Sequence, residues 1–381
     1  MNILLITPGI NKKFNDNYHA YKQIADNNNS VFAISNKENI NKGGRLQMDP
    51  EEEVDGSLFV HRIFKTMREQ QSFLRRLRYK KQVEALVSAF QPDVIFCEEI
   101  SNLKFALDLK RKFRVPIVLR TEFAYDADYP YRSMGRLLKL FKNPLTGDHL
   151  PILLGGLIWR WAYANADAVI SCYFEDAPKQ PQVYNTPFYY VPWPTYYPTI
   201  EEKASRVKNR AVFIGAFDPH KNLSELMSTI PELLRKSPVK EFCVVGTGQD
   251  LDVIENLKAD YPESIRHFHS LSREDCLKLI RDSFFSYSPA TRGGWGFIGD
   301  SWAMGTPIVV THNHYGFFDD VDSIVTSPQD IVRRVNSLYE NESEFERVRE
   351  GGHKRFLENH AAEAVGSRFL KICALAVRSL P

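Results

Sequence analysis

The stretch SPATRGGWGFIGDSWAMGTPIVVTHN, residues 288–313, decides the fold of the second half of this chain. An aromatic strand (FFSY, residues 284–287) comes before it, and residues 297–304 have the composition of a short helix. Gly305-Thr306-Pro307 ends that helix, and the β-branched run IVVT (residues 308–311) is typical of a buried strand. A glycine loop that enters a helix leaves backbone N–H groups unpaired, so the pattern predicts an anion site. Glycines also serve as plain turn residues in many α/β proteins, which is the competing interpretation.

The bulk composition indicates a globular protein of two domains. The chain has 381 residues, of which 43% are hydrophobic and 25% are charged, and its net charge is +2. That charge disfavours a protein that coats nucleic acid. The five cysteines form no CxxC pair, which indicates free thiols in a reducing compartment. Without a signal-peptide or membrane-span pattern, we expect a cytoplasmic protein that could be peripheral to the inner face of a membrane.

The first half alternates strands with helices. We expect strands at residues 2–7, 30–35, 58–63, 93–97, 116–120 and 168–172. Long helices are predicted at 65–90 and 101–113, and the polar segment 37–56 is predicted to be an exposed loop. This alternation predicts a parallel sheet that is covered on both faces.

Several polar or small residues follow these strands, where ligands of such sheets bind. Gly9 follows the first strand, Glu98 and Glu99 follow the fourth, and Glu122 follows the fifth. The acidic side chains could act as acid–base groups or orient sugar hydroxyls. They could equally cap helices or face solvent.

Two basic segments carry aromatic and aliphatic residues as well. They are FLRRLRYKK (residues 73–81) and YRSMGRLLKLFK (residues 131–142). Such helices could lie on an anionic membrane surface, or they could be ordinary solvated faces.

The second half restarts the alternation after a proline- and aromatic-rich connection at residues 188–197. Strands are expected at 211–215, 241–245 and 265–268, with Gly246-Thr247-Gly248 as a second glycine loop. Helices are expected at 223–236, 272–282, 330–339, 344–359 and 361–377. The predicted class is α/β, with Rossmann-like domains at 1–195 and 205–360 and a helix at about 361–381 that packs back on the first. His267/His269 and His312/His314 lack an HExxH partner motif, so no metal site is expected.

The order of these features resembles the nucleotide-sugar glycosyltransferases of the GT-B fold, especially the retaining family 4. The family's G-R-x-x-x-x-K-G turn is similar to residues 215–222, and its V-G-x-G loop to residues 245–248. Its P-S…E-G-F-G…E-A-M-A-x-G-T-P-V-V run is similar to residues 288–309. The resemblance implies two parallel-sheet domains that face a cleft. It also implies a donor site formed by Gly9, Gly215, Lys221, Gly246, Gly248, Gly293, Gly294, Trp295 and Asp300.

The chain departs from the family pattern at charged positions. The family's arginine falls at Ala216, which leaves Lys221 to neutralise the donor diphosphate. The first family glutamate aligns with Arg292 or Gly293, and the second, which holds the ribose, is Asp300. The family's histidine falls near Thr121 or Glu122. Lys221, Glu122 and Arg292 are therefore the predicted catalytic set.

The resemblance implies transfer of a sugar from a UDP- or GDP-linked donor to a glycan, lipid-linked or other hydroxyl, with retention and without a metal. Three alternatives remain at this point. They are a GT-B-like sugar-nucleotide epimerase, a transferase that modifies nucleic acid, and a silent relative that only binds a nucleotide.

Overall fold

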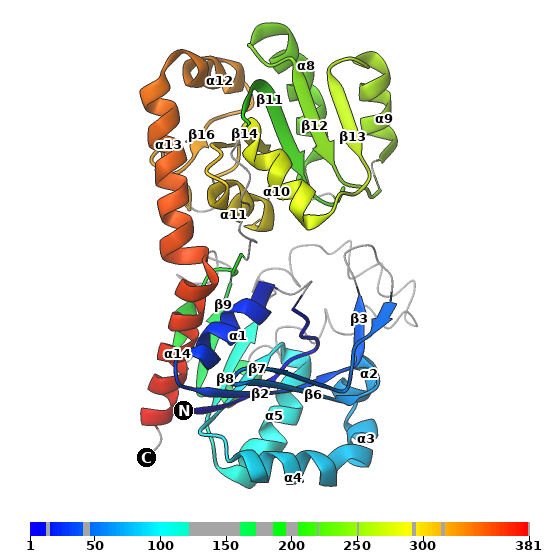
Figure 1. Cartoon of the computed structure of the whole chain (residues 1–381), viewed down its shortest axis with the longest axis vertical. Coiled ribbons are helices and arrows are strands. Elements are labelled where there is room, and N and C mark those ends of the chain that lie inside the picture. The colour runs from blue at the N-terminus through cyan, green and yellow to red at the C-terminus, as the bar shows by residue number, and fades with distance from the viewer. Residues whose placement is uncertain are drawn as a thin grey trace, which may run out of the picture. The chain divides into compact units, whose positions relative to one another are not determined.

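A computed structural model describes residues 1–12, 16–40, 46–121, 161–172, 186–195, 205–218, 221–249, 251–291, 295–313 and 317–379. The chain forms two compact units (Figure 1). The first contains Met1–Pro194 and Val365–Pro381, and the second contains Thr195–Ala364. The candidate residues Glu122, Arg292, Gly293 and Gly294 and the basic segment 131–142 lie outside the described residues.

The first unit is built on an eight-stranded sheet with strand order β10-β9-β8-β7-β1-β2-β6-β5. Its strands are parallel except for β5, which pairs antiparallel with β6. The strands are β1 (Asn2–Ile6), β2 (Ser30–Asn36), β5 (Glu52–Asp55), β6 (Leu58–Phe64), β7 (Val94–Glu98), β8 (Ile117–Thr121), β9 (Ala168–Ser171) and β10 (Phe188–Tyr190). The long parallel sheet is possible because its strands are apolar on both faces.

Helices cover both faces of this sheet. Side chains of β1 alternate between two cores: Ile3 and Leu5 belong to one, Leu4 and Ile6 to the other. The first core includes α1 (Asp16–Asp26) and α14 (Ala362–Arg378), which lie side by side (Figure 1). The second includes α4 (Lys80–Phe90) and α5 (Ile100–Phe113). The last helix thus supplies part of the first unit's core.

Three predictions for the first unit were wrong in detail. The expected loop at 37–56 contains the antiparallel pair β3 (Glu38–Ile40) and β4 (Leu46–Met48), and then β5. The expected helix at 65–90 is broken into α2 (Met67–Gln71), α3 (Phe73–Arg76), η1 (Leu77–Tyr79) and α4, because Ser72 is extended with φ −81° and ψ 121°. The expected connection at 188–197 begins with β10, which pairs with β9 through its aromatic residues.

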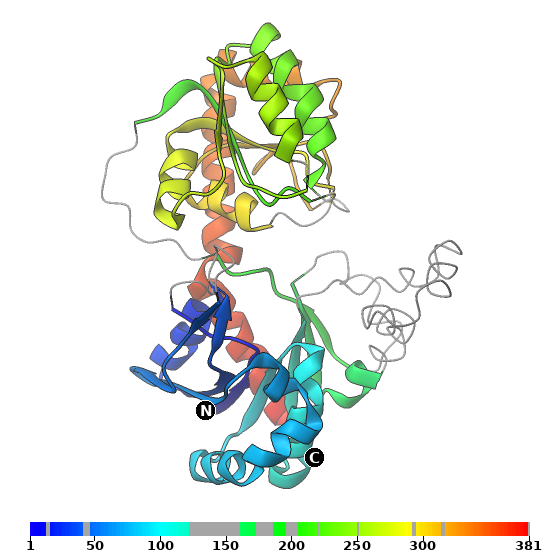
Figure 2. The same ribbon diagram turned by 90° about the vertical axis from the view of Figure 1, so that its right-hand side faces the viewer.

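The second unit has a six-stranded parallel sheet with order β13-β12-β11-β14-β15-β16. Its strands are β11 (Val207–Ile214), β12 (Glu241–Val245), β13 (Ile265–Phe268), β14 (Ser283–Ser288), β15 (Ile308–Val310) and β16 (Ile324–Val325). Figure 2 shows α8 (Leu223–Lys236) and α9 (Leu251–Asp260) on one face and α10 (Arg273–Arg281) on the other. The remaining helices are α11 (Trp295–Ala303), α12 (Ile331–Glu340), α13 (Glu342–Arg355) and a π-helical turn (Phe356–His360).

The α/β class with two mostly parallel sheets is therefore confirmed. In both sheets, helices lie in the crossover connections between parallel strands, as the alternation of strands and helices predicted. Among the helices that the structure describes, none is both long enough and apolar enough to cross a membrane.

Candidate functional site

The candidate donor site lies at the carboxyl edge of the second unit's sheet. Strands β12, β11, β14 and β15 are neighbours and run parallel, so the residues that follow them share one edge. Gly215 follows β11, Gly246 follows β12 and Thr311 follows β15. Ligands of parallel sheets bind at this edge.

The glycine loop after β12 packs directly against the loop after β11. Phe217 N–H donates to the Thr247 carbonyl (3.0 Å), and Gly215 N–H donates to the Val245 carbonyl (3.0 Å). A Cβ added to Gly246 would collide with the Gly215 carbonyl oxygen, and one added to Gly248 would collide with the Phe217 carbonyl oxygen. These two glycines are therefore required by the close approach of two backbone segments.

Lys221 supplies the positive charge beside these loops. Its backbone N–H donates to the Asp218 carbonyl (3.0 Å), and a Cβ added to Gly215 would lie 3.8 Å from the Lys221 Cε. The side chain is half-buried, and burial lowers the pKa of its ammonium although Asp218 acts in the opposite direction. Within the described part of the chain, no carboxylate lies in ion-pair distance of Lys221. A desolvated ammonium without a counter-ion is suited to an anionic ligand.

Asp300 is buried in α11 and already has a partner. Both of its oxygens accept from the Arg273 guanidinium, with Nη2 2.5 Å from Oδ1. Arg273 is the first residue of α10, after Ser272, whose hydroxyl accepts from the Asp275 N–H and caps that helix. A carboxylate has about four lone-pair sites, so it can accept hydrogen bonds in addition to a fork contact with one arginine. Sequence reasoning missed Arg273, because only the packing of α10 against α11 brings it to Asp300.

A second polar cluster at the same edge was also missed. Glu225 in the first turn of α8 accepts from the Tyr287 hydroxyl (2.9 Å), from Asn222 (2.7 Å) and from the Thr311 hydroxyl, and it contacts His312 Nε2 (2.9 Å). Burial and this carboxylate both raise the pKa of Tyr287. The available signal was the sequence THN directly after the β15 run, a polar segment at a strand's carboxyl end.

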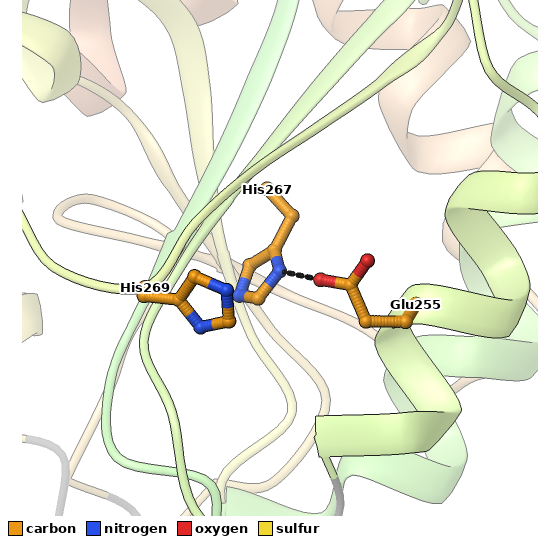
Figure 3. A group of neighbouring side chains, drawn as sticks. All are labelled: Glu255, His267 and His269. Atoms are coloured by element: carbon orange, nitrogen blue, oxygen red, sulfur yellow. Dashed lines mark hydrogen bonds and ion pairs between the residues drawn. The ribbon is translucent and has the colours of Figure 1, made fainter.

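His267 contacts the glycine loop after β12 and a glutamate of α9. Figure 3 shows its ring pointing at Glu255, and Nδ1 lies 2.5 Å from the Glu255 Oε1. Its Nε2 lies 2.9 Å from the Gly246 carbonyl oxygen. The hydrogen bond from His267 lowers the pKa of the Glu255 carboxyl. The ring is therefore fixed between α9 and the loop after β12.

Glu255, His267 and His269 also form a possible metal-ligand group. Within the described residues, their ligand atoms all lie within 4.8 Å of one another. A transition metal could use two imidazoles and a carboxylate. In this structure the Nδ1 of His267 contacts Glu255, and its Nε2 contacts the Gly246 carbonyl oxygen. The expectation that no metal is resident stays a prediction.

In the first unit, Gly9 lies just after β1. Its carbonyl accepts from the Thr7 hydroxyl (3.0 Å), and a Cβ added to Gly9 would have nothing within 4 Å. Nothing in the described fold therefore requires a glycine here.

Glu98, proposed above as a rim acid, has a different environment. It is buried and accepts from the Arg120 Nη1 (2.8 Å) and from the Tyr21 hydroxyl. This side chain stabilises the inside of the first unit and does not face solvent.

Comparison with known proteins finds a family model that matches part of the chain. Residues 199–355 match the family Glycosyl transferases group 1. A curated protein of Bacillus subtilis (strain 168), the uncharacterized glycosyltransferase YqgM, is 24% identical over 194 residues. This alignment spans 48% of the chain and 54% of the relative, about half of its length.

Solved structures match the whole chain at low sequence identity. Sucrose-phosphate synthase from Thermosynechococcus elongatus gives a TM-score of 0.68 at 14% identity and covers 99% of both chains. The Anabaena protein HepE, solved with UDP and glucose, gives 0.60 at 13% identity and covers 100% of both chains. A trehalose-phosphate synthase (UDP-forming) from Burkholderia vietnamiensis gives 0.61 at 12% identity, with 99% of each chain covered. At such identities the likeness shows the fold. The chain thus has the GT-B fold of these glycosyltransferases, and its residues 199–355 match the model of the group 1 family.

Proposed function

We propose that this protein transfers a sugar from a nucleotide-sugar donor to an acceptor hydroxyl. The observation that carries the proposal is Lys221, a half-buried ammonium without an ion-pair partner among the described residues. It lies beside Gly215, at the edge that the Gly246–Gly248 loop shares. The group 1 match over residues 199–355 and the solved HepE complex with UDP and glucose support a nucleotide-sugar donor.

The donor diphosphate would be bound by Lys221 and by backbone N–H groups at the start of α11, around Gly293, Gly294 and Trp295. Charge on the leaving diphosphate would then be stabilised by groups that are already in position. Arg292 would replace the charge of the family arginine that is absent at Ala216. Asp300, held by Arg273, would accept a hydrogen bond from a ribose hydroxyl.

We further propose retention of the anomeric configuration, with the departing phosphate assisting the attacking hydroxyl. No resident metal is needed in this scheme, and UDP- or GDP-sugars are the expected donors. A glycan or lipid-linked acceptor would bind the first unit near Gly9 and Glu122. The reaction would be a step of polysaccharide biosynthesis. The protein would work in the cytoplasm, on the inner face of a membrane that the basic segments 73–81 and 131–142 contact.

The test is a turnover assay on the full chain with a panel of UDP- and GDP-sugars, with and without EDTA and with simple glycans and lipid-linked acceptors. Nucleotide release together with an NMR-defined product of retained configuration supports the proposal. Donor binding without turnover across the whole acceptor panel would overturn it in favour of a silent relative. Epimerisation of the donor in the absence of acceptor would overturn it in favour of an epimerase.

A matched pair of variants links turnover to the site. Lys221→Met should lose donor binding, whereas Lys236→Met should keep it. Lys236 is an exposed lysine that pairs with Glu232 at the end of α8. Equal donor affinity for the two variants would remove Lys221 from the site.

A further inference from the structure

The first unit contains a cavity that the donor site does not use. Its volume is about 480 Å³, within the usual range for small-molecule sites. It lies between the segment that runs from α3 to α4 and the helix α5. Its lining divides into an apolar part and a charged part.

The apolar part is formed by side chains from four elements. Phe64, Val83, Phe105 and Leu109 are almost completely buried, and Leu77 is 49% exposed. The cavity therefore has aromatic and aliphatic walls, with a solvent-exposed leucine at its rim. Such walls favour an alkyl or aryl group.

Arg76 is the unusual member of the charged part. It is 6% exposed, and its Nη1 donates to the backbone carbonyls of Gln70 (2.9 Å) and Gln71 (3.0 Å). Its guanidinium carbon lies 5.3 Å from the centroid of the Phe105 ring. The other terminal nitrogen, Nη2, is buried and has no hydrogen-bond partner among the described residues. Burial lowers the pKa of this guanidinium.

The carboxylates of the lining are already engaged by other cations. Glu84 pairs with Lys112 (2.6 Å) and more distantly with Lys80 (4.0 Å). Asp108 pairs with Lys104 (3.5 Å) and with Arg111 (3.6 Å). Within the described residues, neither carboxylate forms an ion pair with Arg76. The cavity thus holds a buried guanidinium that Asp108 stabilises only at a distance, without an ion pair, and burial of such a charge is unfavourable until an anion binds.

We propose that this cavity binds a small anionic amphiphile, with its carboxylate or phosphate on Arg76 and its alkyl or aryl portion against Phe105 and Leu109. A planar guanidinium with a free N–H suits an oxygen anion, and the apolar walls favour an occupant that also carries a hydrocarbon part. The anion could belong to a free metabolite or to the headgroup of a membrane lipid, because both present the same chemistry.

The site is connected to the carboxyl edge of the first unit's sheet. Gln70, whose carbonyl Arg76 holds, donates from its amide to the Thr7 carbonyl (2.8 Å) and to the Asn102 side chain (3.1 Å). An occupant would therefore contact an arginine that orients α2 beside the end of β1. The inference rests on the first unit alone and does not depend on sugar transfer.

The test is calorimetric titration of the full chain with octanoate and, as the uncharged counterpart, with octanol. We expect saturable binding of octanoate and affinity lower by about tenfold or more for octanol, because the charge-assisted hydrogen bond is lost. Arg76→Met should weaken octanoate binding by a similar factor. Arg78→Met is the matched control, because Arg78 is exposed and does not line the cavity.

A second pair of variants avoids the buried arginine. Leu77→Asp places a carboxylate at the rim and should weaken octanoate binding, whereas Leu74→Asp changes a 74% exposed leucine outside the cavity and should not. No saturable octanoate binding, equal affinity for octanol, or unchanged affinity in both Arg76→Met and Leu77→Asp would overturn the proposal.

Vesicles distinguish the two sources once octanoate has been shown to bind at Arg76. Phosphatidylglycerol vesicles that displace octanoate, where phosphatidylcholine vesicles do not, assign the anion to a lipid headgroup. Octanoate binding that vesicles leave unchanged assigns it to a free metabolite. Each result supports the same pocket chemistry.

Discussion

Replacing Lys221 by methionine should weaken donor binding without destabilising the fold. The side chain of methionine keeps the apolar stem but removes the ammonium that we place against the donor diphosphate. Because Lys221 is half-buried, its contact with phosphate is less screened by solvent than a surface ion pair would be. A charge-assisted hydrogen bond of this kind contributes about 1.5–3 kcal/mol, so affinity should fall by roughly 10- to 150-fold.

Although Lys221→Met should weaken donor binding, it should maintain or raise the stability of the fold. Burial lowers the pKa of Lys221 in the folded state below its unfolded value. The charged form is therefore disfavoured by folding, and this destabilisation is fully present below the folded pKa. It is relieved as pH rises from the folded value to the unfolded value of about 10.4. Lys221→Met should match or exceed the Tm of the natural sequence near neutral pH, with the difference shrinking at alkaline pH.

The assay is paired: calorimetric titration with a UDP-sugar or GDP-sugar that the natural sequence binds, and thermal unfolding at neutral and alkaline pH. Lys236→Met, at an exposed and ion-paired position, is the control for loss of a positive charge. A Lys221→Met protein that binds the donor within about twofold of the natural sequence refutes the diphosphate contact. One that unfolds well below the natural protein refutes the argument about burial.

Three further predictions concern packing, ion pairing and burial in the fold. Gly246→Ala should lower both Tm and donor affinity, because the added Cβ would collide with the Gly215 carbonyl oxygen. Gly296→Ala is the control and should leave Tm nearly unchanged, because a Cβ there meets nothing within 4 Å. Equal losses of Tm in the two variants would contradict this prediction. Arg355→Met should lower the free energy of unfolding by about 3–5 kcal/mol, because the buried carboxylate of Asp322 loses its ion-pair partner. Denaturant titration measures the free energy of unfolding, and a loss near zero would contradict the prediction. Of the five cysteines, half-buried Cys276 should react first with a thiol reagent at mildly alkaline pH, and simultaneous labelling of all five would speak against the fold. Burial raises the pKa of two of the others to about 12, those of Cys243 and Cys373.

Many strands of both sheets could be predicted because a buried strand appears in the sequence as a short run of apolar residues. Runs such as EFCVV and IRHF were placed at the bounds that β12 and β13 have in the structure. β12 is buried after its first residue, so apolar side chains run through it without interruption, whereas β13 is an edge strand in which Arg266 is exposed. The α8 helix was also predicted at its observed bounds, since its apolar residues recur at helical spacing.

Segments whose structure depends on a distant partner were not predicted. β5 is polar and exposed along much of its length, and it is a strand only because β6 offers it a free edge. The break at Ser72 does not interrupt the helical pattern of residues 65–90, but it allows Gln70 to reach the Thr7 carbonyl.

The sequence by itself determined the strand–helix alternation, the glycine loops and the position of Lys221 after a strand, because each depends on neighbouring residues. Only the tertiary structure decided which charges meet. Arg273 and Asp300 are 27 residues apart, and Glu225 and His312 are 87 apart. Such pairs form where crossovers bring strand ends and helix starts to one edge of a sheet, and no local pattern records the partner. For the same reason, the sequence could not show that Lys221 and Arg76 would be partly or fully buried without an ion-pair partner among the described residues.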